Sequence, residues 1–325
     1  MNIFVLGAGG YVGSMLVPAL LNDGHSVIAF DYFLYRDHPL EEHVNLTVVK
    51  GDLREVELLK AYLTDVDIVI HLACISNDPS FELDPSLGRS INLDAFAPFV
   101  ELCKAQGVRR FIYASSSSVY GVKSEERVTE KLSLEPLTDY SLFKAECENI
   151  LLDFSCDTFE TVSVRPATVC GYSPRLRLDV VVNIFSTFAF YKREITVFGG
   201  EQSRPNVNIL DMVECYRILA SAPAEKINGE VFNFGFENHS VFDLANIVKT
   251  VMGSDINIRV ETVNDPRSYR IDSQKFFDSF NYKPVGSIRS AVESLKLAFQ
   301  SNLVIDPLNN PAYSNIKTMQ LKGFS

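Results

Sequence analysis

Residues 3–13 read IFVLGAGGYVG, and this stretch decides the fold of the chain. Its apolar start, Ile3–Leu6, predicts a buried strand, and the pattern over Val12–Leu21 predicts a helix directly after the glycines. Between a strand and a helix, glycines at this spacing form a tight turn and let the backbone reach a pyrophosphate, which the helix N-terminus attracts. The stretch therefore predicts a dinucleotide site, with a glycine turn that binds no ligand as the alternative. The candidate residues are Gly7, Gly10, Tyr11, Val12 and Gly13.

The first half of the chain alternates short β-branched runs with longer amphipathic stretches. This alternation is typical of parallel strands joined by helical crossovers, and an entirely apolar run such as Ile68–Ile70 indicates a sheet covered on both faces. The predicted strands are Ile3–Leu6, Val27–Phe30, Leu46–Val49, Ile68–His71, Phe111–Ala114 and Val162–Val164. The predicted helices are Val12–Leu21, Pro85–Gln106 and Tyr140–Phe154. The fold class is therefore α/β, a Rossmann-like doubly wound parallel sheet with a smaller, irregular C-terminal substrate domain.

The regular alternation ends near Arg165, after which the sequence becomes rich in glycine and proline turns. We predict a dinucleotide-binding Rossmann domain over residues 1–168 and a ligand-binding domain over residues 169–325. Segments around residues 205–235 are candidates for a return to the first domain. The last 25 residues are polar and turn-rich, so they are predicted to form a tail.

Composition and charge exclude several classes of protein. The 325 residues are 46% hydrophobic, which is enough for a substantial core, and the net charge of −11 argues against a nucleic-acid or anionic-membrane surface. The six cysteines show no Cys-x-x-Cys pairing, so we expect reduced thiols in a cytoplasmic protein and no metal site. The N-terminus lacks the basic start and cleavage site of a signal peptide. The longest apolar stretch, Val180–Phe190, is shorter than the about 20 residues that a membrane span needs.

Asp31 closes the second predicted strand, 18 residues beyond Gly13. A carboxylate at this position hydrogen-bonds both ribose hydroxyls and repels a 2′-phosphate, so NAD is favoured over NADP. Arg36 is close enough in the sequence to weaken this preference. After the third and fourth strands, an acidic residue suits an adenine amino group and small residues let the backbone approach the cofactor, although helix capping or a plain strand end is the alternative. These candidates are Asp52, Leu53, Leu72 and Ala73.

Tyr140 and Lys144 are four residues apart, so they share one face of a predicted helix. A positive charge about 5 Å from a phenol contributes roughly 3 of the roughly 4 kcal/mol needed to lower its pKa from about 10 to about 7, and a positive nicotinamide can provide the rest. Tyr140 is therefore the candidate general base, which takes the hydroxyl proton as hydride leaves the same carbon, and Lys144 is its activator. Taken alone, this spacing is also compatible with a solvated helix face.

Several motifs occur together in one order, namely Gly7-x-x-Gly10-x-x-Gly13, Asp31, Asp52-Leu53, His71-Leu72-Ala73, SSSSVYG at residues 115–121, Tyr140-x-x-x-Lys144 and Arg165-Pro166. Over most of its length the chain thereby resembles the extended short-chain dehydrogenase/reductase family of nucleotide-sugar epimerases, dehydratases and reductases. The resemblance implies that Ser116, four residues before Tyr120, is the catalytic serine that holds the reacting oxygen. A polar turn at the end of a strand is the alternative for this serine run. The implied cofactor contacts also include Ser115, Tyr140, Lys144 and Pro166.

Position 118 narrows the reaction that the resemblance implies. Dehydratases and decarboxylases of the family carry an acidic residue two positions after the catalytic Ser or Thr, whereas this chain has Ser118. Elimination therefore lacks its acid, and we expect oxidation and reduction at the sugar C4 hydroxyl, as in an NAD-dependent 4-epimerase with a transient 4-keto intermediate. The alternatives are a net 4-dehydrogenase, a ketosugar reductase, and an NAD-binding sensor without turnover. Asp31 argues against the NADPH that such reductases usually use, and the intact catalytic residues argue against the sensor.

The second half is expected to bind a nucleotide-diphosphate sugar through guanidinium and amide groups, with surface ion pairs as the alternative for the arginines. Arg204, upstream of Asp211, resembles the family's phosphate-binding arginine. Thr168 and Cys170 replace an asparagine and an aromatic residue of many relatives, so the specificity of those relatives does not transfer. Cys170 is a candidate for the sugar pocket, with packing as its alternative. The substrate candidates are Ser116, Ser117, Tyr140, Thr168, Asn183, Arg204, Asn208 and Arg267.

The expected partners follow from the same resemblance. Helices Pro85–Gln106 and Tyr140–Phe154 resemble those that form the dimer interface in the family, so a homodimer is expected. The small-molecule partners are NAD and the nucleotide-diphosphate sugar. No nucleic acid or membrane partner is expected from a chain of net charge −11.

Overall fold

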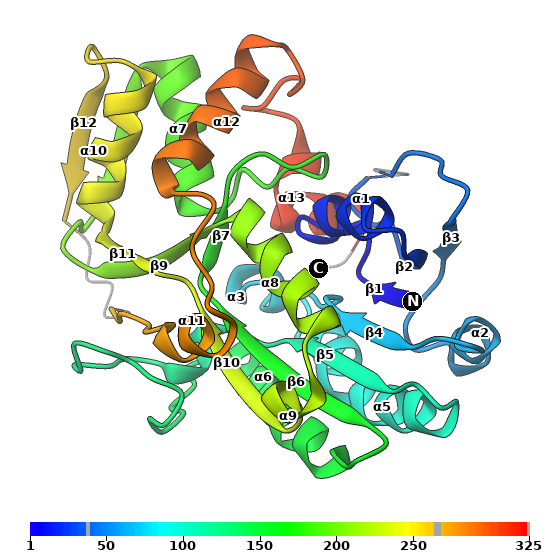
Figure 1. The fold of residues 1–325 in the computed structure, drawn as a ribbon. Coiled ribbons are helices and arrows are strands. Elements are labelled where there is room, and N and C mark those ends of the chain that lie inside the picture. Colours follow the sequence, from blue (N-terminus) through cyan, green and yellow to red (C-terminus); the bar gives the residue numbers. More distant parts are fainter. Residues whose placement is uncertain (37–39, 263–267, 324–325) are drawn as a thin grey trace.

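A sheet of seven parallel strands forms the centre of the protein, in the order β10-β6-β5-β4-β1-β2-β3 (Figure 1). The computed structural model describes residues 1–36, 40–262 and 268–323. The strands of this sheet are β1 (Asn2–Leu6), β2 (Ser26–Asp31), β3 (Leu46–Lys50), β4 (Ile68–His71), β5 (Arg110–Ala114), β6 (Glu160–Pro166) and β10 (Glu230–Phe234). The six strands predicted from the first half are confirmed. The seventh strand, β10, comes from the second half and pairs with β6.

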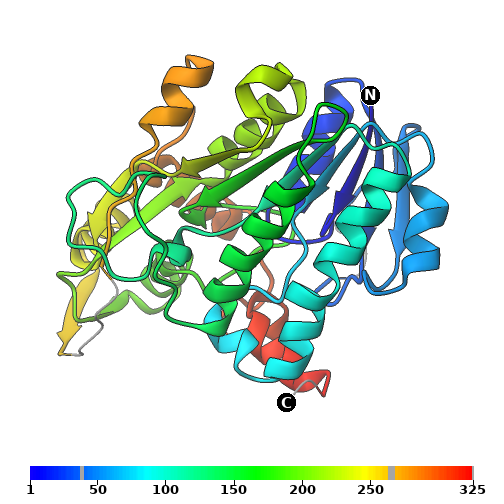
Figure 2. The ribbon, with the colours of Figure 1, turned by 90° about the horizontal axis from the view of Figure 1, so that it is seen from below.

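Helices cover both faces of the sheet, as its apolar strands predicted (Figure 2). On one face, α1 (Gly13–Asn22) and α8 (Ile209–Ser221) share a core with side chains of β1 and β4. On the other face, α2 (Val56–Tyr62), α5 (Phe96–Ala105) and α6 (Asp139–Phe154) bury the alternate residues of the same strands. Predictions of α1 and α6 are confirmed to within one residue at each end.

The predicted single helix Pro85–Gln106 is wrong, because α4 (Pro85–Arg89), the π-helical turn η1 (Ser90–Asp94) and α5 follow one another there. The turn directs Asn92 toward Ile75, which donates its N–H to Oδ1 at 2.8 Å and accepts from Nδ2 at 3.0 Å. Such π turns interrupt helices where a side chain is used locally, often at functional sites. Asn92 thereby fixes the segment after β4, which continues into α3 (Asp78–Phe81).

The second half builds a smaller layer around its own apolar core. In it, α7 (Val181–Lys192), α10 (Val241–Met252) and α12 (Ile288–Gln300) pack together, and α7 and α10 contact the first strand of the pair β8 (Glu194–Phe198) and β12 (Asn257–Glu261). The remaining elements are η2 (Ser117–Tyr120), β7 (Thr168–Cys170), β9 (Ser203–Asn208), α9 (Ala224–Ile227), β11 (Glu237–Ser240), α11 (Gln274–Phe280), η3 (Pro311–Tyr313) and α13 (Asn315–Leu321). Among the described residues, no helix is long and apolar enough to cross a membrane.

The C-terminal tail predicted for the last 25 residues is wrong, because this segment folds back onto the first half (Figure 1). Helix α13 contacts α3, and Met319 is buried in the core beneath α5 and α6. Val304 joins the core of the second half. These two apolar residues are too far apart in the sequence to form a periodic pattern, which is why composition alone indicated a tail.

The carboxyl ends of the parallel strands meet at one edge of the sheet. Gly7 follows β1, Asp31 ends β2, Leu72 follows β4 and Ser115 follows β5, so the residues predicted to bind the cofactor share this edge. In open α/β sheets this is the edge at which ligands bind.

Acid is expected to destabilise the protein through His71, which is buried among four aromatic rings. Burial, together with the charge of Lys144, lowers its pKa from 6.5 to about 3. Below about pH 6.5, His71 therefore becomes protonated in the unfolded chain but stays neutral in the folded chain. The contribution of His71 to stability is complete above this pH and is lost as the pH falls toward 3. Going from pH 7 to pH 5 is expected to cost about 2 kcal/mol of unfolding free energy, measured by urea unfolding.

His71→Leu is expected to remove this share of the loss, because the apolar side chain does not titrate. His43→Gln, at an exposed position, is the matched control and is expected to keep the dependence of the wild type. The same loss between pH 7 and pH 5 in His71→Leu and in the wild type would contradict the prediction.

Candidate active site

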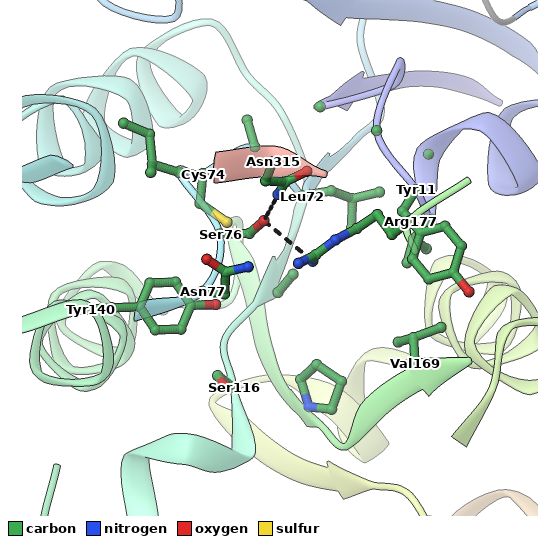
Figure 3. Close-up of a pocket in the computed structure, with 18 of the residues that line it drawn as sticks. Tyr11, Leu72, Cys74, Ser76, Asn77, Ser116, Tyr140, Val169, Arg177 and Asn315 are labelled. Atoms are coloured by element: carbon green, nitrogen blue, oxygen red, sulfur yellow. Dashed lines mark hydrogen bonds between the residues drawn. The ribbon is translucent and has the colours of Figure 1, made fainter. Parts of the chain in front are cut away.

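A cavity of about 700 Å³ lies at the carboxyl edge of the sheet, between the two halves of the chain (Figure 3). It gathers residues that are far apart in the sequence. Most of the residues predicted from sequence line it, namely Gly7, Gly10, Tyr11, Val12, Gly13, Asp31, Asp52, Leu53, Leu72, Ala73, Ser115, Ser116, Ser117, Tyr140, Pro166, Thr168 and Arg204.

The glycine turn can pack closely against the neighbouring backbone only because it lacks side chains. Gly7 has φ +91°, and a Cβ there would lie 2.6 Å from the backbone nitrogen of Ala73. A Cβ at Gly13 would meet the carbonyl oxygens of Gly7 and Ala8. The turn leads directly into the N-terminus of α1, where backbone N–H groups and the helix dipole favour an anion. The backbone therefore fits the pyrophosphate of a dinucleotide.

Asp31 lies beside the glycine turn in a position that fits a ribose. Its carboxylate accepts the backbone N–H of Gly9 at 2.9 Å and that of Phe33 at 2.7 Å. Burial raises its pKa, and these two hydrogen bonds oppose the rise. Arg36, which we expected to weaken the preference for NAD, instead donates to the carbonyl of Pro174. Asp52, the candidate for the adenine, forms an ion pair of 2.6 Å with Arg54.

Ser116 and Tyr140 face the same cavity from two different elements (Figure 3). Ser116 precedes η2, and its Oγ accepts the N–H of Ser118 at 3.1 Å and shares a hydrogen bond of 2.8 Å with the Ser118 hydroxyl. Tyr140 stands in the first turn of α6, which the reciprocal bonds between Thr138 and Ser141 cap. Ser116 is one of the groups that lower the pKa of Tyr140, so the two side chains lie near each other in the cavity.

The activation of Tyr140 by Lys144 stays a prediction, and Arg177 is a second cation near the phenol. Burial raises the pKa of Tyr140 well above 10, and the cation that opposes this rise is Arg177. Lys144 donates to the carbonyl of Ala114 at 2.6 Å, and its Nζ lies 4.8 Å from the ring centroid of Tyr113 but 5.9 Å from that of Tyr140. Lys144 lies outside the set of described residues that line the cavity, because its ammonium points to the end of β5.

A buried ion pair that we did not predict supports the serine stretch. Glu148, four residues after Lys144 on α6, accepts the hydroxyl of Ser115 and pairs with Arg165 at 2.6 Å. Arg165 also donates to the hydroxyl of Tyr120 at 2.7 Å. The α6 face that carries Tyr140 thus also fixes both ends of the serine stretch. The spacing of Tyr140, Lys144 and Glu148 along one helix face could have indicated this role.

Two predicted substrate residues have structural roles instead. Asn183 is fully buried, and its Oδ1 accepts the backbone N–H of Gly171. Its Nδ2 donates to the Tyr11 hydroxyl at 2.9 Å and to the carbonyl of Arg177 at 2.8 Å. Asn208 caps α8 through Leu210 and donates to the carbonyl of Ser287. Neither residue lines the cavity, so both substrate assignments are corrected. The sequence shows that these residues carry amides, but it does not show that the amides already have hydrogen-bond partners within the protein.

The remaining substrate candidates differ in position. Arg204 lines the cavity from β9. Arg267 lies outside the described residues. Cys170 is fully buried and its thiol donates to the carbonyl of Val207, which fits packing rather than a sugar pocket.

A charged segment that sequence analysis missed forms one wall of the cavity. Arg175, Arg177 and Asp179 line it from the loop before α7, and Arg177 pairs with Asp179 at 2.8 Å. Asn315 of α13 lines the same wall and donates to Ser76 Oγ at 2.8 Å (Figure 3). In the sequence the charged residues alternate with leucines, which could have signalled a segment with one face buried and one face on a site.

Comparison with known proteins shows the family of the chain. A sequence model of the NAD dependent epimerase/dehydratase family matches residues 3–235. The uncharacterized UDP-glucose epimerase YtcB of Bacillus subtilis (strain 168) is 28% identical over 93% of this chain and 99% of its own length. UDP-glucuronic acid decarboxylase 1 of Arabidopsis thaliana is 27% identical over 94% of this chain and 71% of its own length.

A solved structure adds a cofactor and a substrate to the comparison. UDP-glucuronic acid 4-epimerase from Bacillus cereus, in complex with UDP-glucuronic acid and NAD, is 26% identical and has a TM-score of 0.82. The similarity covers 93% of this chain and 100% of that chain. The chain is thus similar throughout to UDP-sugar epimerases and decarboxylases.

Proposed function

The chain belongs to the NAD dependent epimerase/dehydratase family, and we propose that within it the protein is a nucleotide-sugar 4-epimerase. The observation that carries this proposal is the arrangement of Ser116 and Tyr140 in one cavity with the glycine turn, next to Ser118 and not to an acid. Residues 169–325 would supply most of the nucleotide-sugar contacts. The relatives that bind UDP-sugars make a uridine nucleotide the first candidate.

NAD is the cofactor of the family, and when bound it supplies the acceptor and donor of the transferred hydride. The residues of this chain fit it at two points. The backbone of Gly7, Gly10 and Gly13 would hold the pyrophosphate at the N-terminus of α1. The carboxylate of Asp31 would hold the ribose, as its place at the end of β2 suggests.

Tyr140 would take the proton of the sugar C4 hydroxyl as the sugar becomes a 4-ketone and would return it in the reverse step. Ser116, which lines the same cavity, would donate a hydrogen bond to the same oxygen and keep it in line with the phenol. Since burial raises the pKa of Tyr140, the phenol needs positive charge nearby to accept a proton, and Arg177 is such a charge. Return of hydride to the opposite face of the ketone would complete the epimerisation.

The carboxylates of the cavity support epimerisation over elimination. Those that line it are Asp31, Asp52, Asp78 and Asp179. Each is engaged elsewhere: Asp31 with backbone N–H groups, Asp52 with Arg54, Asp78 with Thr138 at 2.7 Å, and Asp179 with Arg177. On the serine stretch itself, Ser118 offers a hydroxyl where dehydratases and decarboxylases of the family have an acid. These contacts support hydride chemistry over elimination.

Incubation with UDP-, GDP-, dTDP- and CDP-sugars tests the proposal. Sugar stereochemistry is followed by NMR, and nicotinamide absorbance is followed in parallel. Epimerisation at C4 without net NADH is the expected result. Accumulation of NADH with a ketone would identify a dehydrogenase, consumption of NADH with a ketosugar would identify a reductase, and binding without turnover would identify a sensor; each of these outcomes overturns the proposal.

The assembly is a separate proposal. We propose a cytoplasmic homodimer that pairs α5 and α6 of two copies, because Leu142 and Leu152 on α6 are 40% and 51% exposed. Sedimentation velocity at micromolar concentration would measure it. A monomer under these conditions would overturn it.

A further inference from the structure

Arg175 is a buried guanidinium that has no carboxylate partner among the described residues. Its side chain lines the cavity, is 3% exposed and lies 4.1 Å from the ring centroid of Tyr35. Across residues 1–36, 40–262 and 268–323, no Asp or Glu forms an ion pair with it, and its Nε has no hydrogen-bond partner. Burial and the charge of Arg177 lower its pKa to about 10. Asp179 and Asp31 act on this charge from a distance, but among the described residues neither forms an ion pair with it, so the position favours an anionic ligand.

The position of Arg175 relative to α1 indicates which anion. Its backbone N–H donates to Ser14 Oγ at 3.3 Å, and Ser14 shares a hydrogen bond of 2.8 Å with Ser173. Ser173 in turn donates to the carbonyl of Tyr11 at 2.8 Å. These bonds connect the loop that carries Arg175 and Arg177, here called the arginine loop, to the glycine turn and to the N-terminus of α1. The guanidinium thus adds a full positive charge to the end of the helix that already favours a phosphate.

The residues that would hold the two ends of the cofactor act on different arginines of the loop before α7. Asp31, the ribose residue, acts electrostatically on Arg175, whereas Tyr140, at the reacting centre, acts on Arg177. A dinucleotide that extends from Asp31 to Tyr140 must place its pyrophosphate between them. Arg175 is therefore on the path of the pyrophosphate, on the wall that faces the glycine turn.

The C-terminal segment holds Arg175 in this position. Asn315 is 1% exposed, and its Oδ1 accepts from the guanidinium of Arg175. Its Nδ2 donates to Ser76 Oγ at 2.8 Å, and its backbone N–H donates to Asp179 at 2.9 Å. Met319, one turn further along α13, lines the same cavity. One residue near the C-terminus thus joins the loop after β4 to both ends of the arginine loop.

We propose that Arg175 binds the pyrophosphate of NAD and that Asn315 is the positioning residue that orients its guanidinium. The C-terminal segment, residues 314–321, is then a part of the cofactor site and not an appendage. The inference needs only the NAD cofactor and is independent of the sugar chemistry.

Binding to the cofactor-free protein tests the proposal, with NAD, ADP and adenosine titrated in competition with NADH fluorescence. Arg175→Met is expected to weaken NAD and ADP by about 10- to 100-fold, the usual range for one charge-assisted bond to a phosphate, and to leave adenosine within about twofold. Arg175→Lys is expected to recover part of the loss. Asn315→Asp is expected to weaken NAD by about tenfold, because the new carboxylate competes with the pyrophosphate for the guanidinium.

The thermal stability of the cofactor-free variants provides a second readout. Arg175→Met and Asn315→Asp are both expected to melt at or above the temperature of the wild type, because the first removes the buried charge and the second gives it a carboxylate partner. A purely structural role would lower it. Asn309→Asp, an identical charge change at an exposed position five residues before this segment, is expected to leave NAD binding unchanged.

Three results would overturn the proposal. The first is unchanged NAD affinity in Arg175→Met. The second is an equal loss for adenosine, which would mean that the arginine shapes the adenosine pocket. The third is a loss of UDP affinity with NAD affinity retained, which would assign Arg175 to the sugar nucleotide. Failure of the 4-epimerase proposal would appear only in the turnover assay and leaves these titrations unaffected.

Discussion

Replacement of Tyr140 by phenylalanine is expected to lower turnover at least about a hundredfold while the protein folds and binds NAD as before. The substitution removes only the phenolic hydroxyl of a side chain that lines the cavity. The ring keeps its place at the start of α6, packed against the core beneath α5. The loss should therefore appear in kcat, with KM for the sugar nucleotide within a few-fold of the wild type.

The measurement is steady-state turnover on the sugar nucleotide that the NMR assay identifies, with NAD content determined in parallel. Tyr191→Phe, on α7 and outside the described lining of the cavity, is the matched control and is expected to retain full turnover. If Tyr140→Phe turned over at the rate of Tyr191→Phe, the phenol would not be the acid–base group. The proposed mechanism would then fail.

The second large effect is expected at the glycine turn, where Gly7→Ala should abolish tight NAD binding. Its φ of +91° strains any side chain, and a Cβ would also lie 2.6 Å from the backbone nitrogen of Ala73. Backbone atoms cannot rotate away, so β1 and the segment after β4 must separate. We expect NAD affinity to fall at least about a hundredfold and the unfolding free energy to fall by more than about 3 kcal/mol.

Gly107→Ala separates the two causes of this effect. Gly107 has φ +82°, but a Cβ there meets nothing within 4 Å. It should therefore lose only the about 1–2 kcal/mol of a strained backbone and keep its NAD affinity. Urea unfolding and NADH fluorescence titration measure both quantities. Equal losses in the two variants would show that the close approach to Ala73 has no importance.

The sequence predicted those features that depend on local pattern. The strands of the first half, α1 and α6 follow from apolar runs and glycine punctuation, because those signals lie within a few residues of one another. Asp31, Ser116 and Tyr140 could be assigned because each lies at the end of a predicted element, and parallel strands bring such ends to one edge. The cavity that they line is the outcome of that simple geometry.

Features that depend on distant partners could not be predicted. The π-helical turn exists because Asn92 binds the backbone of Ile75, a bond that no periodicity encodes. Lys144 satisfies the helix spacing with Tyr140, yet its ammonium binds the carbonyl of Ala114, since side-chain direction depends on the strand packed beneath it. Asn183 has an amide that could bind a ligand, but this amide forms hydrogen bonds with Tyr11 and Gly171.

The pairing of β10 with β6 has a consequence for how the chain is made. Synthesis from the N-terminus completes β6 at Pro166, but its partner at the edge of the sheet ends only at Phe234. Until then, the N–H and carbonyl groups along the edge of β6 have no partner strand. Apolar residues such as Val162 and Val164, which are buried in the complete fold, remain exposed. A nascent chain that pauses between these points is therefore the species most exposed to mispairing with another chain. For the same reason a fragment cut at residue 168 would carry an unprotected sheet edge, so the dinucleotide-binding half is not a separable unit of folding.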